Sequence, residues 1–306
     1  MKQRLKKIAR FLFEKIQILG IDVLPQYFYS GIPNIKKLKE DNFWKYPRTM
    51  FGVNGVEISE QIKFLERCCS KDLIDRQKEN NIHLMASQMN GESGFGEIEA
   101  DFLFCFVNTI RPARIIQVGA GLSTAVILLA AKESNYNPII TAIDPYPTNF
   151  LEKVGQENKI KLIKKEAQKL PLETFLSLED GDLLFIDSTH TVKPGSEVNF
   201  LILEVLPRLK KGVYVHFHDI YFPYDYSRNL LSDALFFSNE SVLLHAFLTQ
   251  NFNYRIALSL SMLHYAASNE LKKCLPRFIP QINDQGLKAQ DKSEGNFPSS
   301  SYLLKI

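Results

Sequence analysis

Long apolar runs, paired cysteines and an excess of charge of one sign are all scarce in this chain of 306 residues. No stretch of about 18 consecutive apolar residues occurs, so the sequence predicts no membrane-spanning helix. The net charge is only +3, from 37 basic and 34 acidic residues, which argues against nucleic acid as a partner. The hydrophobic share of 45% and the charged share of 23% are typical of a globular protein and exclude a disordered chain.

Cysteine is used sparingly and without metal-ligand or disulfide spacing. The four cysteines are Cys68, Cys69, Cys105 and Cys274, and none of them forms a CxxC pair. We expect all four to be reduced and buried. This pattern indicates a cytoplasmic enzyme rather than a secreted scaffold held by disulfides.

The basic charge is concentrated at the N-terminus. Residues 1–20 hold six basic residues against one acidic residue, a local net charge of +5 that leaves −2 for the rest of the chain. Apolar residues of the segment 3–19 recur on one helical face: Ile8, Phe11, Leu12, Ile16 and Leu19. Such a helix can lie on an anionic membrane as a peripheral contact, or pack on the protein itself or on a second subunit of a homo-oligomer. Glu14 and Lys15 interrupt the apolar stretch and no small-residue cleavage site follows, so we do not expect a signal peptide.

The periodicity becomes regular from about residue 98. Residues 21–50 read as an irregular arm, 56–80 as helical and 89–97 as a loop. Apolar runs that read as strands then alternate with helices: strands at 114–118, 138–144, 159–165, 182–187 and 212–219, and helices at 98–110, 123–133 and 196–209. Alternation of this kind predicts an α/β fold with a doubly wound, mostly parallel sheet.

Further segments complete the predicted organisation. Residues 254–260 and 301–306 are expected to add strands, and 283–298 to form a mobile surface loop. The chain is therefore predicted to consist of an N-terminal helical extension, 1–88, and a ligand-binding domain, 89–306.

Ligands of open α/β sheets bind at the carboxyl ends of the strands, and the first such end carries a glycine turn, VGAGLST at 118–124. Gly119 and Gly121 allow close approach of a ligand, and the following helix offers free N–H groups. Asp144 ends the second strand, where a carboxylate can hold both hydroxyls of a ribose, and Glu166 follows the third, within reach of an adenine. Thr124 stands where a dinucleotide fingerprint has its third glycine, which disfavours nicotinamide or flavin. A tight turn without ligand, with Asp144 as a turn residue, stays open.

The fourth and fifth strands end in polar motifs, IDSTH at 186–190 and HFHD at 216–219. Adjacent strands lie about 4.8 Å apart, so side chains at these two ends can share one ion. Carboxylates with an imidazole suit a divalent metal such as Mg²⁺ or Mn²⁺, although histidine is an uncommon ligand of Mg²⁺. The candidate residues are Asp187, His190, His218 and Asp219. A capping role for Asp187 and a core position for His218 are the alternatives.

The order of these motifs resembles the class I S-adenosylmethionine-dependent methyltransferases. More narrowly, it resembles the group of metal-dependent macrolide sugar O-methyltransferases and cephalosporin-hydroxylase-like proteins, over about residues 90–265. Gln117 and His218 depart from the family pattern, which often has an acid at both positions.

The resemblance implies a role for each matching residue. Gly119, Ala120 and Gly121 would contact the methionine part of S-adenosylmethionine, and Ser123 and Thr124 would bond its carboxylate. Asp144 and Glu166 would hold the ribose and the adenine, and Asp187 would border the cofactor as well as the metal. The remaining matches are metal ligands and a general base: Asp187, His218 and Asp219 for the metal, and His190, neutral near pH 7, for the base.

The function that these expectations favour is O-methylation of a sugar or other vicinal diol, in a small-molecule or glycan acceptor. Two alternatives remain: a nucleotide-sugar oxidoreductase with a nicotinamide cofactor, and a non-catalytic cofactor-binding scaffold. The set of Asp187, His190, His218 and Asp219 favours chemistry over a scaffold, because a scaffold does not need such a convergence.

Overall fold

A computed structural model describes the chain except for residues 1, 25, 42, 228–229, 232–235 and 282–294. It divides into two compact units, 1–43 and 44–306, which we describe separately. The first unit contains α1 (Lys2–Gln17), at the place where the sequence predicts an amphipathic helix, and α2 (Ile35–Glu40). The side chain of Asn34 accepts a hydrogen bond from the Lys37 N–H and so caps α2, which lies inside the segment expected to be irregular.

The second unit is built on a sheet of seven strands in the order β3-β2-β1-β4-β5-β7-β6. The strands are β1 (Arg114–Val118), β2 (Ile139–Ile143), β3 (Lys161–Ile163), β4 (Leu183–Ile186), β5 (Tyr214–Phe217), β6 (Tyr254–Ser259) and β7 (Ser301–Lys305). β1 to β5 are parallel, and β7 runs antiparallel to both of its neighbours. The predicted doubly wound, mostly parallel sheet is confirmed.

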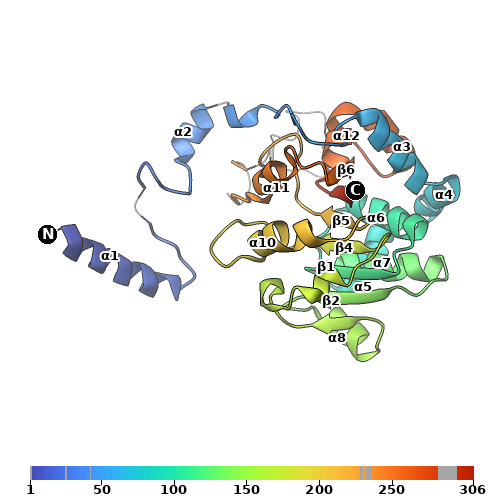
Figure 1. Ribbon diagram of the computed structural model, residues 1–306, viewed down its shortest axis with the longest axis horizontal. Coiled ribbons are helices and arrows are strands. Elements are labelled where there is room, and N and C mark those ends of the chain that lie inside the picture. Colours follow the sequence, from blue (N-terminus) through green and yellow to red (C-terminus); the bar gives the residue numbers. More distant parts are fainter. Residues whose placement is uncertain (1, 25, 42, 228–229, 232–235, 282–294) are drawn as a thin grey trace. The chain divides into compact units, whose positions relative to one another are not determined.

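The side chains of alternate residues in the central strands pack into two hydrophobic cores, one on each face of the sheet. Ile115 of β1 packs in one core and Ile116 in the other, and Leu183 and Leu184 of β4 divide in the same way. A strand whose two faces are both covered has no solvated side, which explains why these strands are apolar without alternation. Helices accordingly lie on both sides of the sheet (Figure 1).

The α-helices of the second unit follow in chain order: α3 (Ile58–Cys68), α4 (Lys71–Glu79), α5 (Ile82–Asn90), α6 (Glu97–Ile110), α7 (Leu122–Glu133), α8 (Asn149–Gln156), α9 (Glu173–Leu176), α10 (Glu197–Phe200), α11 (Glu240–Leu248), α12 (Leu260–Ala266) and α13 (Ser268–Cys274). Short helical segments of other pitch are η1 (Phe43–Lys45), η2 (Ala167–Lys169), η3 (Leu201–Val205) and η4 (Leu206–Arg208). Within the described residues, no helix has both the length and the apolar character needed to cross a membrane.

Helices α3 to α5 belong to the second unit, in whose core Leu65, Ile82 and Ala86 are buried. The predicted division into an extension, 1–88, and a ligand-binding domain, 89–306, stays a prediction. All four cysteines are buried with free thiols, as expected. The loop expected to be mobile, 283–298, falls for the most part outside the described residues.

Candidate active site

Strand register brings the predicted site residues to one edge of the sheet. The registers of β2, β1, β4 and β5 align Ile143, Val118, Ile186 and Phe217. The residues that follow these four are Asp144, Gly119, Asp187 and His218. Because adjacent strands are spaced by about 4.8 Å, the four residues form a continuous row at the carboxyl edge.

The conformation of the glycine turn is fixed by the backbone of Asp187 on one side and by the carboxylate of Asp144 on the other. Gly119 has a φ of +78°, and a Cβ at this position would overlap the carbonyl oxygen of Asp187, so no side chain fits there. The carboxylate of Asp144 accepts hydrogen bonds from the Ala120 N–H at 3.2 Å and from the Tyr146 N–H at 2.8 Å. Asp144 therefore ties the turn after β1 to the end of β2.

Gln117, which is completely buried, makes hydrogen bonds to two side chains in the first turn of α7. Its amide donates to the Ser123 hydroxyl at 3.0 Å and accepts from the Thr124 hydroxyl at 2.8 Å. A carboxylate could not donate to Ser123, which gives a physical reason for glutamine at position 117. Both hydroxyls are buried and already have partners in the fold, so their predicted contact with a cofactor carboxylate stays a prediction.

A cavity of about 490 Å³ opens beside this turn. Four of the predicted cofactor residues line it: Gly119, Asp144, Glu166 and Asp187. Glu166 pairs with Lys169 at 2.7 Å. Glu197 also lines the cavity, and its carboxylate accepts from the N–H and the hydroxyl of Thr189 at 2.9 and 2.7 Å. The sequence reasoning did not identify Glu197, which orders the loop after β4.

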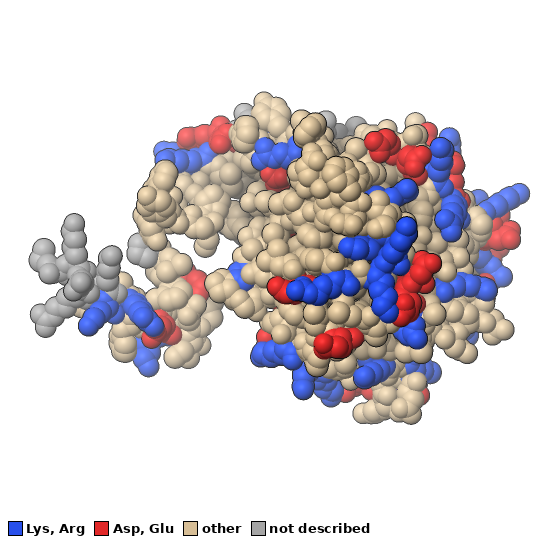
Figure 2. All heavy atoms as spheres, in the orientation of Figure 1, with Lys and Arg blue, Asp and Glu red and all other residues tan. Residues whose placement is uncertain are grey.

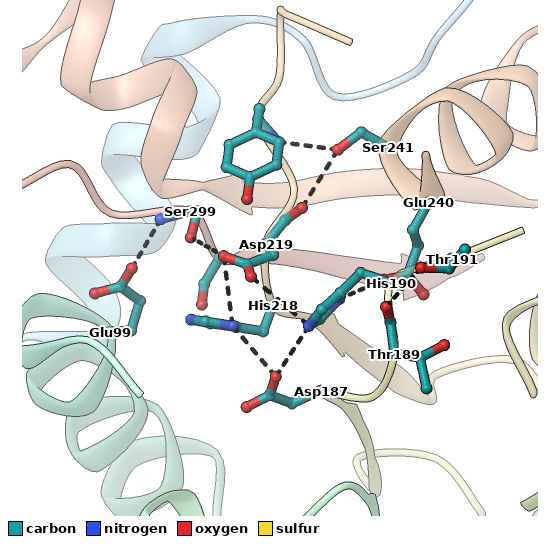
Figure 3. Close-up of polar contacts among 12 residues, drawn as sticks. Glu99, Asp187, Thr189, His190, Thr191, His218, Asp219, Glu240, Ser241 and Ser299 are labelled. Atoms are coloured by element: carbon teal, nitrogen blue, oxygen red, sulfur yellow. Dashed lines mark hydrogen bonds and ion pairs between the residues drawn. The ribbon is translucent and has the colours of Figure 1, made fainter. Parts of the chain in front are cut away.

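Next to the cavity lies a cluster of ionisable groups, in which two buried imidazoles stand between two half-buried carboxylates (Figure 3). The Nε2 of His190 lies 3.4 Å from Asp187 Oδ1 and 3.7 Å from Asp219 Oδ2. The Nδ1 of His218 lies 3.3 Å from Asp187 Oδ1 and 3.6 Å from Asp219 Oδ1. The predicted convergence of these four residues is thus present.

Two of the four residues adopt left-handed backbone conformations, with φ of +55° at His190 and +52° at Asp219. Such angles are uncommon outside glycine and cost energy, so the surroundings must hold them. The carbonyl of His190 accepts from the N–H groups of Asn239 and Glu240 at 3.1 and 3.2 Å, and the Asp219 carboxylate accepts from the Ser299 hydroxyl at 2.9 Å. The backbone is thus bent to bring both side chains into the cluster.

Glu240, on α11, is the most informative residue that the sequence reasoning missed. Its carboxylate oxygen Oε2 lies 2.8 Å from His190 Nδ1, and the residue is completely buried. The available signal was an Asn-Glu pair opening an apolar segment at 239–248, which is typical of a helix start. Glu99, at the start of α6, is also buried here and accepts from the Ser299 N–H at 2.8 Å.

Burial and pairing together set the charge of the cluster. Burial alone would lower the pKa of His190, but the hydrogen bonds to Asp187 and Glu240 outweigh it and hold this pKa well above its usual range. Burial also opposes the charge of His218, yet Asp187 and Asp219 raise its pKa to about 9. For Asp187 the two histidines overcome burial and lower the pKa. The sequence led us to expect neutral His190 near pH 7, whereas this arrangement favours the imidazolium.

The donor atoms of the cluster fit a divalent metal. Asp187, His190 and His218 place ligand atoms within 4.8 Å of one another, and His218 Nδ1 is buried without a hydrogen-bond partner of good geometry. The predicted ligand set was Asp187, His218 and Asp219, whereas the donors within this distance are those of Asp187, His190 and His218. A site that includes an imidazole suits a transition ion better than Mg²⁺.

Comparisons with known proteins agree with the fold. Residues 116–220, from β1 to just beyond β5, match a family model described as a methyltransferase domain. A protein of Archaeoglobus fulgidus, itself described only as uncharacterized, is 31% identical over 191 residues, which cover 59% of this chain and 85% of the relative.

Similar solved structures are methyltransferases at low sequence identity. The SAH-bound Podospora anserina methyltransferase PaMTH1 is 11% identical with a TM-score of 0.42, covering 78% of this chain and 97% of that one. A putative caffeoyl-CoA O-methyltransferase from Staphylococcus aureus is 17% identical with a TM-score of 0.39, covering 77% and 98%. We conclude that residues 116–220 of this chain form a methyltransferase domain, and that the chain is related to the archaeal protein over 191 residues.

Proposed function

We propose that the protein uses S-adenosylmethionine to methylate a hydroxyl of a sugar or another vicinal diol, in a small molecule or a glycan. The observation that supports this most strongly is the position of Asp187, which both lines the cavity beside Gly119 and belongs to the His190 cluster. A methyl donor in the cavity and an acceptor at the cluster would therefore meet at one residue.

Residues in and beside the cavity would each hold one part of the proposed cofactor. The carboxylate of Asp144 would accept hydrogen bonds from both ribose hydroxyls, and Glu166 would accept from the adenine amino group. The N–H groups at the start of α7 would face the methionine carboxylate. The sulfonium, which is positively charged, would lie close to the Asp187 carboxylate, whose lowered pKa keeps it ionised.

Methyl transfer is an in-line displacement, for which the protein mainly has to position the partners. The acceptor oxygen attacks the methyl carbon, the carbon–sulfur bond breaks, and the sulfur keeps the electron pair. The hydroxyl proton would pass to Nε2 of His190 when that nitrogen is unprotonated. Glu240 would hold the Nδ1–H and so leave Nε2 as the acceptor, much as an acid orients the histidine of other dyads.

A divalent metal would fit beside this base. Asp187, His218 and Asp219 would hold it, and when bound it would supply Lewis acidity that lowers the pKa of a coordinated hydroxyl. His190 would then receive the proton from the acceptor.

The test is transfer of a labelled methyl group from S-adenosylmethionine to a panel of sugars, glycans and simple diols. We expect label in at least one vicinal-diol acceptor and none in the matching deoxy compound. Cofactor binding without transfer to any acceptor would favour the scaffold, and calorimetric binding of NAD instead of S-adenosylmethionine would favour the oxidoreductase.

A further inference from the structure

Exposed apolar side chains are concentrated in the first unit. Of the 26 large apolar residues that the described structure leaves exposed, 12 lie between Ile8 and Ile32. Ile8, Phe11 and Leu12 on α1 are each more than half exposed, at 53%, 58% and 51%. Single apolar residues on a surface are ordinary, but a concentration of this kind marks an interaction site.

The apolar residues of α1 form a stripe. Ile8, Leu12 and the half-buried Ile16 follow one another at intervals of four residues, with Phe11 beside them. Arg10 falls on the opposite side of the helix and pairs with Glu14, while Lys7 borders the stripe. A shallow, mostly apolar groove of about 540 Å³ continues the stripe, and its lining residues are Ala9, Arg10, Leu12, Phe13 and Ile16 of α1 and Val23 and Leu24 of the segment that follows.

The two units differ in net charge as clearly as they differ in their number of exposed apolar residues. Residues 1–43 carry nine basic and four acidic residues, a net charge of +5, while the remainder of the chain carries −2. On the visible face of the second unit, basic and acidic side chains are interspersed (Figure 2). The first unit thus combines cations with exposed apolar side chains, whereas the second balances its charges.

From this combination we infer that the first unit docks the protein onto an anionic lipid surface, with α1 lying in the interface plane. Basic residues are attracted by anionic headgroups, and an apolar stripe is buried at the boundary with the acyl chains. This inference is independent of the proposed methyl transfer.

Other occupants fit less well. In a symmetric dimer the same patch meets itself, so two surfaces of +5 would face each other. A nucleic acid would neutralise the cations but would leave the stripe of Ile8, Leu12 and Ile16 without a partner. Of these three occupants, an anionic lipid surface satisfies both the charge and the apolar side chains.

The experiment is sedimentation of the full-length protein with lipid vesicles. One set contains two parts phosphatidylcholine to one part phosphatidylglycerol, and the other contains phosphatidylcholine alone. We expect binding to the first set, much weaker binding to the second, and weakening of the first at about 0.5 M salt.

Two variants and two matched controls assign the binding to α1. Lys7→Glu/Arg10→Glu should weaken vesicle binding about tenfold or more, because each basic residue near an anionic surface contributes separately. Lys272→Glu/Lys273→Glu, on the exposed side of α13, changes the net charge equally and should leave binding unchanged. Phe11→Ser should also weaken binding, whereas Phe252→Ser, at a residue 68% exposed in the second unit, should not.

Several results would overturn the inference. The first is an absence of binding to anionic vesicles, and the second is equal binding by the α1 variants and their controls. A concentration-dependent dimer that only the α1 variants lose, seen by analytical ultracentrifugation without vesicle binding, would assign the patch to a second copy. A lower melting temperature of the α1 variants without vesicle binding would assign the helix to packing within the protein.

Discussion

The two halves of the sheet's carboxyl edge are built differently. Around β1 and β2 the edge opens into a cavity, and its carboxylate, Asp144, is satisfied by backbone N–H groups. Around β4 and β5 the edge carries two buried imidazoles, His190 and His218, whose pKa values are raised by the carboxylates beside them. The first half is suited to holding a ligand and the second to moving a proton. Substitutions in the first half should therefore affect cofactor binding, and substitutions in the second half should affect methyl transfer. Asp187 belongs to both halves.

Removal of metal should have the largest effect, and it should act on the β4–β5 half alone. We expect thorough chelation to abolish methyl transfer while calorimetric binding of S-adenosylmethionine persists, because Asp187 is the one proposed ligand among the described residues that line the cavity. Activity should return on addition of a divalent transition ion. Full activity after metal stripping, verified by elemental analysis, would remove the metal from the mechanism.

The substitution His190→Ala should have the second-largest effect on methyl transfer. Loss of a general base typically costs about 10²- to 10⁴-fold in rate, and we expect a fall of this size in kcat with little change in cofactor affinity. His245→Ala is the matched control, because His245 lies toward the far end of α11 and packs against Phe222. Undiminished turnover of His190→Ala with the true acceptor would refute the role of His190.

Glu240→Gln should have an intermediate effect and a diagnostic pH profile. The Glu240 carboxylate raises the pKa of His190, so its neutralisation should lower that pKa. The base acts only when unprotonated, so transfer should increase with pH through this pKa, and in the variant the increase should begin at lower pH. We expect the maximal rate to fall about tenfold to a hundredfold, because the amide oxygen can still accept the Nδ1–H but no longer stabilises the imidazolium with a negative charge. A loss of activity with an unshifted profile would make Glu240 merely structural.

Asp144→Asn should have the smallest effect, and it should lower cofactor affinity and not the catalytic rate. The amide still accepts a hydrogen bond but loses the charge, so we expect cofactor affinity to fall about tenfold. The rate at saturating cofactor should be nearly unchanged. Asp75→Asn, at an exposed pair with Lys78 on α4, serves as the control. A fall in kcat without a change in affinity would contradict the division between the two halves.

The sequence was most informative where function depends on strand ends. The apolar runs end at Asp144, Asp187 and Asp219, and the parallel pairing of the strands is enough to bring these ends to one edge of the sheet. It was least informative where function depends on packing between distant segments. Glu240 reaches His190 across 50 positions of sequence, and the charge of His190 depends on burial that no local motif reveals. The same applies to helices α3 to α5, because no local motif reveals that their apolar residues pack in the core of the second unit.

The central claim is best tested by a crystal structure of the protein with S-adenosylhomocysteine. Density for the ribose should lie at Asp144 and the adenine near Glu166, with the sulfur directed toward Asp187 and His190. Bound ligand at any other edge of the sheet, or a sulfur turned away from the two imidazoles, would contradict it.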